Sequence, residues 1–273
     1  MQLEKKISII TINWNNADGL RKTLESVASQ LTTACEFVVI DGASTDGSVA
    51  LIEAHQKSID QRRSVPKEGI YADMNKGIAL ATGEYCLFLN SGDWLQEGGL
   101  ARALAQCTGE DVIYFDSGLS YDGIKTDTYC YPAKLTMRNF YHGTIGHQTT
   151  LIKRELFTRF GLYNDGNRIH SDYEFWLKAI IVGNCTCNYV NQTITWYDMS
   201  GRSSKPNEET AREVADIQAR YLPERVLADY EHWYKREKEM QVMDWYRQRS
   251  YLYQPLVLVY KVVKNLKKIL GIG

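Results

Sequence analysis

The chain has 273 residues, of which 44% are hydrophobic and 24% charged, and its formal net charge is −1. A chain of this length and composition can bury an ordinary core without disulfides or a second subunit. The near-neutral charge argues against a nucleic-acid-binding protein, which would carry a basic excess on one face or one helix.

The amino-terminal residues carry charges without an apolar signal core behind them, so we expect no export signal. No stretch reaches the ~20 apolar residues that a membrane-spanning helix needs. The six cysteines show no paired Cys-x-x-Cys spacing, which favours reduced thiols over a metal site or a disulfide framework. We therefore expect a cytoplasmic protein.

Apolar runs alternate with helical patterns through the first part of the chain. Residues 7–12 and Phe37–Ile40 are predicted strands, and Asp18–Gln30 between them has apolar residues at helical spacing. The pattern continues with predicted helices at Asp46–Gln56, Ile70–Ala81 and Leu95–Gln106 and a predicted strand at Tyr85–Leu89. This alternation predicts a mainly parallel sheet covered on both faces.

The pattern becomes more mixed after Asp111–Asp116. We expect a hairpin around Tyr121–Ile124, a strand at Gly146–Ile152, a helix at Tyr173–Val182, a strand near Thr186–Tyr197 and a polar loop over Asp198–Glu208. From Glu209 onward the sequence is helical in character and rich in charged and aromatic residues.

Polar residues gather where the predicted strands end and where one predicted helix begins. They are Thr11–Asn15, Asp41-Gly42, Asn90–Asp93 and Ser171-Asp172. Ligands of open α/β sheets bind beyond the carboxyl ends of the strands, so we expect a single shared site. Asn90–Asp93 is the most informative of these segments, because it offers oxygen ligands and one carboxylate, Asp93, where a metal is expected.

Each segment also has a purely structural interpretation. Asn90–Asp93 and Asp41-Gly42 are common turn sequences, and Ser44–Gly47 can cap a helix. Ser171-x-x-Glu174 fits a capping box, which leaves Asp172 in the first helical turn, where the helix dipole favours an acid. The order and spacing of the segments, rather than any one of them, favour a functional site.

Taken together, these segments strongly resemble the family 2 glycosyltransferases of GT-A fold, and among them the bacterial enzymes that build surface polysaccharides. The resemblance covers about residues 5–205, and the segments that carry it are Ser8–Asn15, Val39–Gly47, Gly69–Gly77, Phe88–Asp93 and Ser171–Trp176. It implies an α/β GT-A domain over 1–205, with a mainly parallel central sheet and flanking helices. A carboxyl-terminal helical extension would follow over 206–273.

The resemblance also implies how the sugar-nucleotide donor is held. Asp41 would bind the base of the nucleotide, and Thr11 and Asn13 would line the same pocket. Asn75 would help to fix the donor. Gly201-Arg202-Ser203 matches a loop that often closes near the donor phosphates in this family.

On the reaction side, the resemblance implies that Asp93 coordinates a divalent cation, Mg²⁺ or Mn²⁺, with Asn90 and Ser91 beside the substrate. Asp172 sits where the family has its catalytic base. His147, in Gly146-His147-Gln148, lies in a segment that related enzymes have between donor and acceptor. A strand histidine satisfied by hydrogen bonds is the alternative interpretation of His147.

Three departures from the family pattern bear on these roles. The metal motif, commonly Asp-x-Asp-Asp, has Asn90 and Gly92 at two acidic positions, although one carboxylate plus substrate phosphates suffices for Mg²⁺. The family pattern Gly-Ile-Tyr-Asp-Ala-Met-Asn appears here with Ala72 and Asp73 exchanged, which puts the roles of Tyr71 and Asp73 in doubt. A Gln-x-x-Arg-Trp element, typical of processive polymerising members, is absent.

We therefore predict an inverting glycosyltransferase that moves a sugar from a nucleoside-diphosphate donor, with UDP favoured, to a hydroxyl of a glycan or lipid-linked glycan. A sugar-phosphate nucleotidyltransferase is disfavoured because residues 13–18 are not a Gly- and Arg-rich phosphate loop. A non-catalytic sugar-binding scaffold of the same fold stays open, since the metal motif has lost acids.

The carboxyl-terminal segment between Tyr253 and Ile272 has the pattern of a basic amphipathic helix. Lys261, Lys264 and Lys268 recur at helical spacing, and the remaining surface is apolar through Leu258, Val262, Leu266, Ile269 and Leu270. Such a helix can lie on the inner face of a membrane, where lysines are attracted to anionic lipids. The alternative is a helix packed on the domain with its lysines in solvent.

Overall fold

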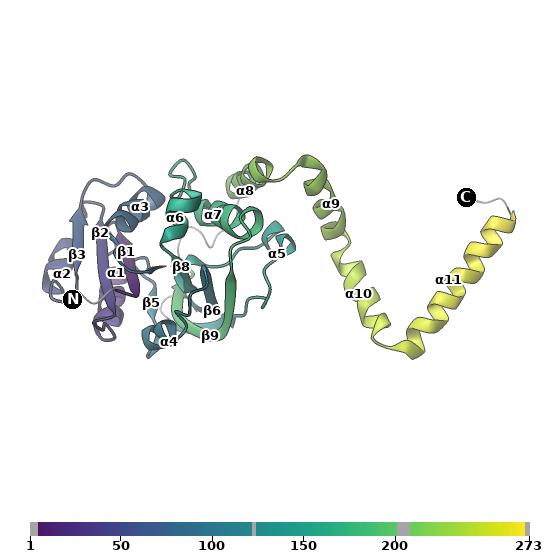
Figure 1. The fold of residues 1–273 in the computed structure, drawn as a ribbon, viewed down its shortest axis with the longest axis horizontal. Coiled ribbons are helices and arrows are strands. Elements are labelled where there is room, and N and C mark those ends of the chain that lie inside the picture. The colour runs from purple at the N-terminus through teal and green to yellow at the C-terminus, as the bar shows by residue number, and fades with distance from the viewer. Residues whose placement is uncertain (1–4, 122–123, 201–207, 271–273) are drawn as a thin grey trace. The chain divides into compact units, whose positions relative to one another are not determined.

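The computed structural model describes residues 5–121, 124–200 and 208–270 (Figure 1). The chain forms two compact units, Met1–Tyr221 and Leu222–Gly273. The expected division into 1–205 and 206–273 stays a prediction; helix α8 (Glu208–Tyr221) groups with the first unit.

The first unit begins with the predicted strand–helix–strand. Strand β1 (Ile7–Asn13), helix α1 (Ala17–Ala28) and strand β2 (Cys35–Asp41) confirm three expected elements, and every residue of both strands is buried. Helix α2 (Ser48–Ala54) is shorter than expected. Strand β3 (Gln61–Ser64) was not expected, because its residues are all polar or charged and show no apolar run.

The parallel pattern extends through the next elements. Helix α3 (Ile70–Leu80) precedes strand β4 (Tyr85–Phe88), which pairs in parallel with β1. Leu95 belongs to the short strand β5 (Trp94–Leu95) rather than to the predicted helix, because β5 pairs with a later strand. The helix itself, α4, is confined to Gly99–Ala105.

The rest of the first unit mixes helices with antiparallel strands. The expected hairpin is formed by β6 (Val112–Tyr121) and β7 (Ile124–Tyr129). The elements that follow are α5 (Met137–Tyr141), the 3₁₀ helix η1 (His147–Thr149), β8 (Thr150–Lys153), α6 (Glu155–Phe160), α7 (Ser171–Trp176), the π-helix η2 (Leu177–Val182) and β9 (Cys187–Asp198).

The nine strands found in the described residues form one sheet in the order β3-β2-β1-β4-β8-β6-β9-β5, with β7 beside β6. Strands β3, β2, β1 and β4 are parallel, β8 is antiparallel to both neighbours, and β6 and β9 are parallel. Helices flank the sheet (Figure 1). The carboxyl ends of β1, β2 and β4 therefore share one edge, and that edge carries the predicted site.

The capping box expected at Ser171 and Glu174 is wrong. His170 is the residue that precedes the helix, and its side chain makes no capping hydrogen bond. The Ser171 hydroxyl instead donates to the carbonyl of Asn164, and Glu174 points into a polar cluster made with α8. Both side chains therefore bond to residues distant from the start of the helix instead of capping it. Asp172 lies in the first turn, as expected.

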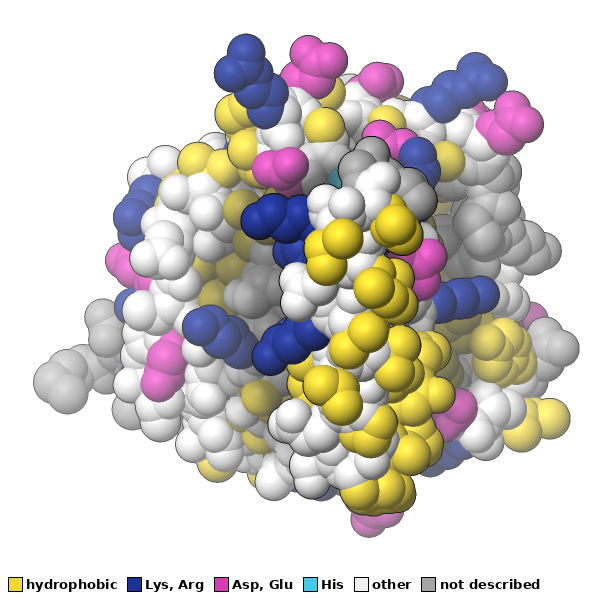
Figure 2. All heavy atoms as spheres, turned by 90° about the vertical axis from the view of Figure 1, so that its right-hand side faces the viewer, with side chains coloured by type: hydrophobic (Ala, Val, Ile, Leu, Met, Phe, Trp, Pro, Cys, Tyr) yellow, Lys and Arg dark blue, Asp and Glu magenta, His cyan; other side chains and the backbone are white. Residues whose placement is uncertain are grey.

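The second unit contains helices α9 (Glu224–Lys235), α10 (Glu237–Arg247) and α11 (Ser250–Leu270), and none of their residues is buried. Figure 2 shows hydrophobic side chains in a continuous column on the side that faces the viewer, with Lys and Arg side chains along one edge. Among the described residues, no helix has both the length and the apolar character needed to cross a membrane.

Candidate active site

The site lies at the shared strand edge. Asn13 and Asp41 are register partners at the ends of β1 and β2, and the Gly42 amide donates to the Asn13 carbonyl at 2.8 Å. The loop after β4 joins the same edge, because the Ser91 amide donates to the Ile12 carbonyl at 3.1 Å. The strand ends thus bring together residues that are up to about 80 positions apart, as the sequence pattern predicted.

Asp41 is buried and its carboxylate is held from three sides. It accepts hydrogen bonds from the Asn13 amide group at 2.9 Å, the Ser44 backbone amide at 2.9 Å and the Ser64 hydroxyl at 3.0 Å. The side-chain carbonyl oxygen of Asn13, Oδ1, is buried and has no hydrogen-bond partner in the described part of the chain. Asp41 therefore orients Asn13 and leaves it with a free buried acceptor.

A hollow of about 240 Å³ opens beside Asp41, lined in part by Val39, Arg63 and Ser64. Trp14, the first residue of the loop that follows β1, is 47% exposed, and the ammonium group of Lys67 lies 3.5 Å from the centre of its ring. An exposed indole at a strand end is a flat surface on which a planar ligand can stack. In the sequence, the only indication that Trp14 belongs to the site is its position next to Asn13.

Two residues expected at the donor site use their polar groups on the protein itself. Thr11 is fully buried, and its hydroxyl donates to the Leu89 carbonyl at 2.7 Å. Asn75 forms two hydrogen bonds with the backbone of Tyr163, one to its carbonyl at 2.8 Å and one from its amide at 3.1 Å. These hydrogen bonds fix the loops in which Leu89 and Tyr163 lie.

The loop Asn90–Asp93 is tied to the start of α1. Thr23 donates to the Asp93 carbonyl at 2.7 Å, and Asn16 donates through its side chain to the Ser91 carbonyl at 3.0 Å. Gly92 has φ +111°, a left-handed conformation that favours glycine. A β-carbon there would lie 3.6 Å from the Asp198 carboxylate, so the missing side chain leaves room between the two loops.

Asp93 is 95% buried, since only 5% of its surface is exposed, and its Oδ1 accepts a hydrogen bond from the Asp198 backbone amide at 2.9 Å. Burial raises the pKa of Asp93 to about 7, the Asp198 amide and His147 oppose this rise, and the Asp198 charge adds to it. An acid with so high a pKa is poorly stabilised as a carboxylate by its protein surroundings alone. A bound cation would favour its ionised form.

Asp198 is a second carboxylate at this position, and the sequence pattern predicts for it only the start of a polar loop. The pairing of β5 with β9, in which Trp94 faces Trp196, brings the end of β9 next to Asp93. The carboxylate of Asp198 accepts from the Ser200 amide through Oδ1. Nothing in the local sequence could have indicated this approach across 105 residues.

These donors fit a hard divalent cation. Mg²⁺ and Mn²⁺ prefer oxygen ligands and commonly use one or two carboxylates together with substrate phosphates. The loop offers Asp93, the nearby Asp198, and the side-chain oxygen of Asn90, which is buried and has no partner among the described residues. No group of three or more His, Cys, Asp or Glu residues suited to a metal occurs in the described ranges.

Asp172, His147 and Asn90 form a chain of hydrogen bonds. His147 Nδ1 lies 3.0 Å from Asp172 Oδ2, and His147 Nε2 lies 3.2 Å from the amide nitrogen of Asn90. A carboxylate oxygen only accepts, so Nδ1 carries the ring proton and Nε2 accepts from Asn90. The histidine thus links the acid at the start of α7 to the loop that contains Asp93.

The second oxygen of Asp172, Oδ1, accepts from the Tyr71 hydroxyl at 3.0 Å and from the Tyr173 amide at 2.9 Å. Burial alone would raise the pKa of Asp172, but the hydrogen bond from His147, together with these two donors, holds it below its ordinary value of 3.8. Burial and the Asp172 charge raise the pKa of Tyr71 well above its ordinary value of 10. Asp172 is therefore an anion and Tyr71 a neutral donor at neutral pH.

Helix α8 fixes the helix that carries Asp172. Glu174, two residues further along α7, accepts from Arg220 at 3.2 Å and from the Tyr221 hydroxyl at 2.5 Å, both on α8. Glu213 of α8 pairs with His170 at 2.8 Å, immediately before α7 begins. These contacts fix α7 on both sides of Asp172 in the sequence. Asp172 is therefore held in place by the packing of α8 as well as by its own helix.

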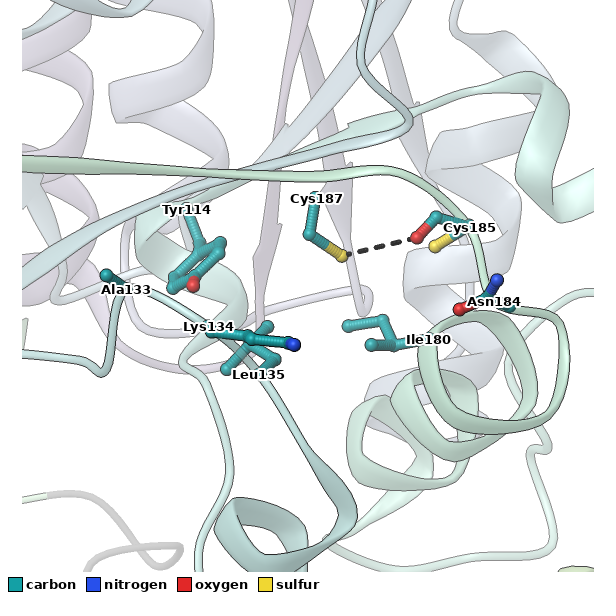
Figure 3. Close-up of a pocket in the computed structure, with 8 residues that line it drawn as sticks. All are labelled: Tyr114, Ala133, Lys134, Leu135, Ile180, Asn184, Cys185 and Cys187. Carbon is teal, nitrogen blue, oxygen red and sulfur yellow. Dashed lines mark hydrogen bonds between the residues drawn. The ribbon is translucent and has the colours of Figure 1, made fainter.

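A different hollow of about 140 Å³ lies at the start of β9 and contains none of the predicted site residues (Figure 3). Tyr114, Lys134, Leu135 and Ile180 line it together with two cysteines. The Cys187 thiol donates to the carbonyl of Cys185 at 3.7 Å, and both cysteines are free thiols, as expected. The expected loop Gly201-Arg202-Ser203 lies outside the described residues.

Comparison with known proteins decides the family. Residues 8–163 match the family model described as Glycosyl transferase family 2. The chain belongs to glycosyltransferase family 2. An uncharacterized glycosyltransferase of Mycobacterium tuberculosis is 30% identical over 224 residues, which cover 79% of this chain and 85% of that protein. A Bacillus subtilis glycosyltransferase whose name assigns it to teichuronic acid biosynthesis is 28% identical, covering 74% of this chain and 82% of its own length.

Solved structures agree on the fold of this family 2 glycosyltransferase. Residues 1–349 of Staphylococcus aureus TarS in complex with UDP-GlcNAc superpose with a TM-score of 0.64 at 19% identity, covering 82% of this chain and 70% of that one. The mannosyltransferase PcManGT of Pyrobaculum calidifontis, solved with GDP-Man and Mn²⁺, gives 0.55 at 16% identity, covering 73% and 58%. The predicted α/β GT-A fold is confirmed, and the protein is a glycosyltransferase.

Proposed function

We propose that the chain transfers a sugar from a nucleoside-diphosphate sugar, with a UDP-sugar favoured, to a hydroxyl of a glycan or lipid-linked glycan, with inversion at the anomeric carbon. The observation that carries this proposal is the hydrogen-bonded series Asp172–His147–Asn90, which ends at the loop of Asp93. It connects an ionised acid suited to accept a proton with oxygen donors suited to a cation.

The nucleotide is assigned to the hollow beside Asp41. The free buried Oδ1 of Asn13 can accept a hydrogen bond from a ring N–H of a base, and Asp41 holds the Asn13 side chain in the orientation that makes this possible. The Trp14 ring can stack on the base or ribose. Thr11 and Asn75 are assigned to the same donor site by the resemblance, and their side chains form hydrogen bonds with the Leu89 and Tyr163 backbone.

The diphosphate is assigned to the loop of Asp93. Asp93, Asn90 and Asp198 would hold Mg²⁺ or Mn²⁺, which would stabilise the charge that develops on the leaving diphosphate. Ser91 lies between these residues in the loop and is assigned to the same phosphates. Support comes from the buried oxygen of Asn90, which has no hydrogen-bond partner among the residues that the structure describes, and from the high pKa of Asp93.

The acceptor hydroxyl is assigned to Asp172. This carboxylate accepts the proton as the hydroxyl oxygen attacks the anomeric carbon, and the bond from that carbon to the diphosphate oxygen breaks. Attack from the face opposite the leaving group inverts the configuration. His147 and Tyr71 hold the carboxylate in place and keep it ionised, so Asp172 acts through its position more than through its basicity.

The biosynthetic process to which the reaction belongs is inferred from the relatives. One is named for teichuronic acid biosynthesis, and a Mycobacterium bovis relative, 27% identical over 71% of this chain, is named for PGL/p-HBAD biosynthesis. We assign this chain to the assembly of a bacterial surface polysaccharide or glycolipid, with the catalytic domain on the cytoplasmic side, where nucleotide sugars are made.

A panel of UDP-, GDP- and dTDP-sugars, each with and without Mg²⁺ or Mn²⁺, tests the donor by thermal stabilisation. We expect one nucleotide class to stabilise the protein in a metal-dependent way, and slow donor hydrolysis to accompany binding. Donor binding without hydrolysis or transfer, unchanged in Asp172→Asn, would instead support the non-catalytic scaffold. No stabilisation by any of these sugars would contradict both.

A further inference from the structure

Helix α11 (Ser250–Leu270) presents its apolar side chains to solvent. Most of them are exposed, with exposed fractions from 45% for Leu256 to 79% for Ile269, whereas Leu252 and Val257 are half-buried. None of its residues is buried, and the same holds for the other two helices of this unit. A surface of this kind normally has a binding partner, because monomeric proteins rarely expose a large contiguous apolar patch.

Most apolar residues of α11 lie on the side of the helix opposite its lysines, and Val257, which falls between Lys264 and Lys268, is an exception. At 100° per residue, Leu258, Val262, Leu266 and Ile269 lie within 80° of one another, and Val259, Val263 and Leu270 widen this stripe on one side. Lys261, Lys264 and Lys268 project from the other side, and Lys267 lies at the border. The continuous column of hydrophobic side chains with basic side chains at its edge is visible in Figure 2.

The charge of α11 has one sign. Its 21 residues include four lysines and no aspartate or glutamate, in a chain whose net charge is −1. A surface complementary to this helix must accept apolar side chains and carry negative charge beside them. The interface of a bilayer with anionic headgroups has both properties.

A second copy of the helix fits less well. A coiled-coil seam is a narrow stripe flanked by charges of both signs, whereas the stripe of α11 is wide and its flanks are only basic. Insertion across the bilayer would place Lys261 and Lys264 in the hydrocarbon. An orientation in the membrane plane instead buries the stripe and leaves the lysines among the headgroups.

We propose that α11 anchors the protein to anionic membranes by lying in the plane of the interface. This inference goes beyond the proposed function and does not depend on it. Each lysine near an anionic surface contributes about fivefold to the partition coefficient, so the three lysines opposite the stripe contribute on the order of 100-fold together. The apolar stripe supplies the rest of the affinity.

The test is cosedimentation of the full-length protein with vesicles of phosphatidylcholine containing 30% phosphatidylglycerol, compared with pure phosphatidylcholine. We expect binding to the anionic vesicles that weakens as salt rises, because the Debye length falls from about 10 Å at 0.1 M to about 3 Å at 1 M. The triple variant Lys261→Gln, Lys264→Gln, Lys268→Gln should bind about 100-fold more weakly.

A matched variant controls for net charge. Lys57, Lys134 and Lys238 are exposed and lie outside α11, so replacing them with Gln removes the same charge from elsewhere. Leu258→Gln, Val262→Gln and Leu266→Gln together should reduce binding to both vesicle types. Circular dichroism melting curves should show the same transition for all variants, which excludes loss of the fold as a cause.

Three results would overturn the proposal. The first is an equal loss of binding in the control triple, which would make the effect one of net charge alone. The second is anionic-vesicle binding that the α11 variants leave unchanged. The third is lipid-independent self-association, measured by light scattering and abolished by the Leu258, Val262 and Leu266 variant, because it would assign the stripe to a second copy of the chain.

Discussion

Replacing Asp93 with Asn should stabilise the metal-free protein at high pH. The substitution keeps the shape and an oxygen that can accept from the Asp198 amide, and it removes an acid whose burial raises its pKa from 3.8 to about 7. A raised acid pKa means that the folded state prefers the protonated form. Protonated Asp93 therefore contributes to the free energy of unfolding. This contribution is complete below the unfolded-state pKa and is lost progressively as the pH rises towards 7.

The magnitude follows from the same shift. About three pKa units at about 1.4 kcal/mol each give an upper limit of about 4 kcal/mol for the cost of ionising Asp93 in the folded protein at pH 8. At pH 5 the cost is smaller, about 1–2 kcal/mol, because the acid is still protonated in the folded state. The advantage of Asp93→Asn over wild type should therefore grow by about 2–3 kcal/mol between these pH values.

Urea unfolding at pH 5 and pH 8 in the presence of EDTA measures this difference. Asp165→Asn, at an exposed loop position, is the control and should show no such pH dependence. With donor and Mn²⁺ added, the order should reverse, since only the wild type retains the carboxylate for the cation. If the variant is less stable than wild type at pH 8 without metal, or if its advantage does not change with pH, then burial does not raise the pKa of Asp93 as stated.

Three further outcomes follow from the site. Asp172→Asn should lower sugar transfer by about 10²–10⁴-fold while leaving donor affinity and the melting temperature nearly unchanged; near-normal turnover would leave Asp172 as a structural acid only. His147→Gln removes the strongest influence that lowers the pKa of Asp172, so the acid limb of the pH profile of kcat/KM should move to higher pH, and an unmoved limb would contradict the pairing. The affinity for Mn²⁺, followed by electron paramagnetic resonance, should rise up to about tenfold per pH unit below pH 7 because Asp93 must lose its proton, and Asp198→Asn should weaken it at every pH; a flat, unaltered affinity would exclude both residues as ligands.

The strand edge could be predicted from the sequence because it depends on local periodicity. Buried runs mark β1, β2 and β4, and parallel strands end at one edge, so Asn13, Asp41 and the loop of Asp93 had to meet there. The predicted length of β4 and the predicted start of α4 were less accurate. Leu95 was expected in the helix, but it lies in β5, which pairs with β9. Polar β3 carried no apolar signal at all.

The detailed contacts of the site could not be predicted, because they join segments that are distant in sequence. His147 reaches Asp172 through the antiparallel placement of β8, and Asp198 reaches Asp93 across 105 residues. The expected capping box failed for the same reason: Glu174 has partners on α8 that a local pattern does not contain. Sequence patterns indicate which groups are available, whereas tertiary packing determines the partner that each group takes.

The two acids of the site have pKa values that their surroundings move in opposite directions, and this difference assigns their roles. Both are largely buried, and burial disfavours the charge on each. At Asp172 three donors more than offset burial, so the acid stays ionised and available to a proton. At Asp93 a single backbone amide does not offset burial, and the neighbouring Asp198 adds to the cost of ionisation.

A bound divalent cation would remove the cost of ionising Asp93. If Asp93 were instead the proton acceptor, with its pKa near 7, the cation bound in the same loop would occupy its carboxylate and prevent it from taking a proton. Opposite shifts in paired carboxylates commonly separate two functions. Here they favour cation binding for Asp93 and proton acceptance for Asp172, and the reverse assignment would require each group to work against its own environment.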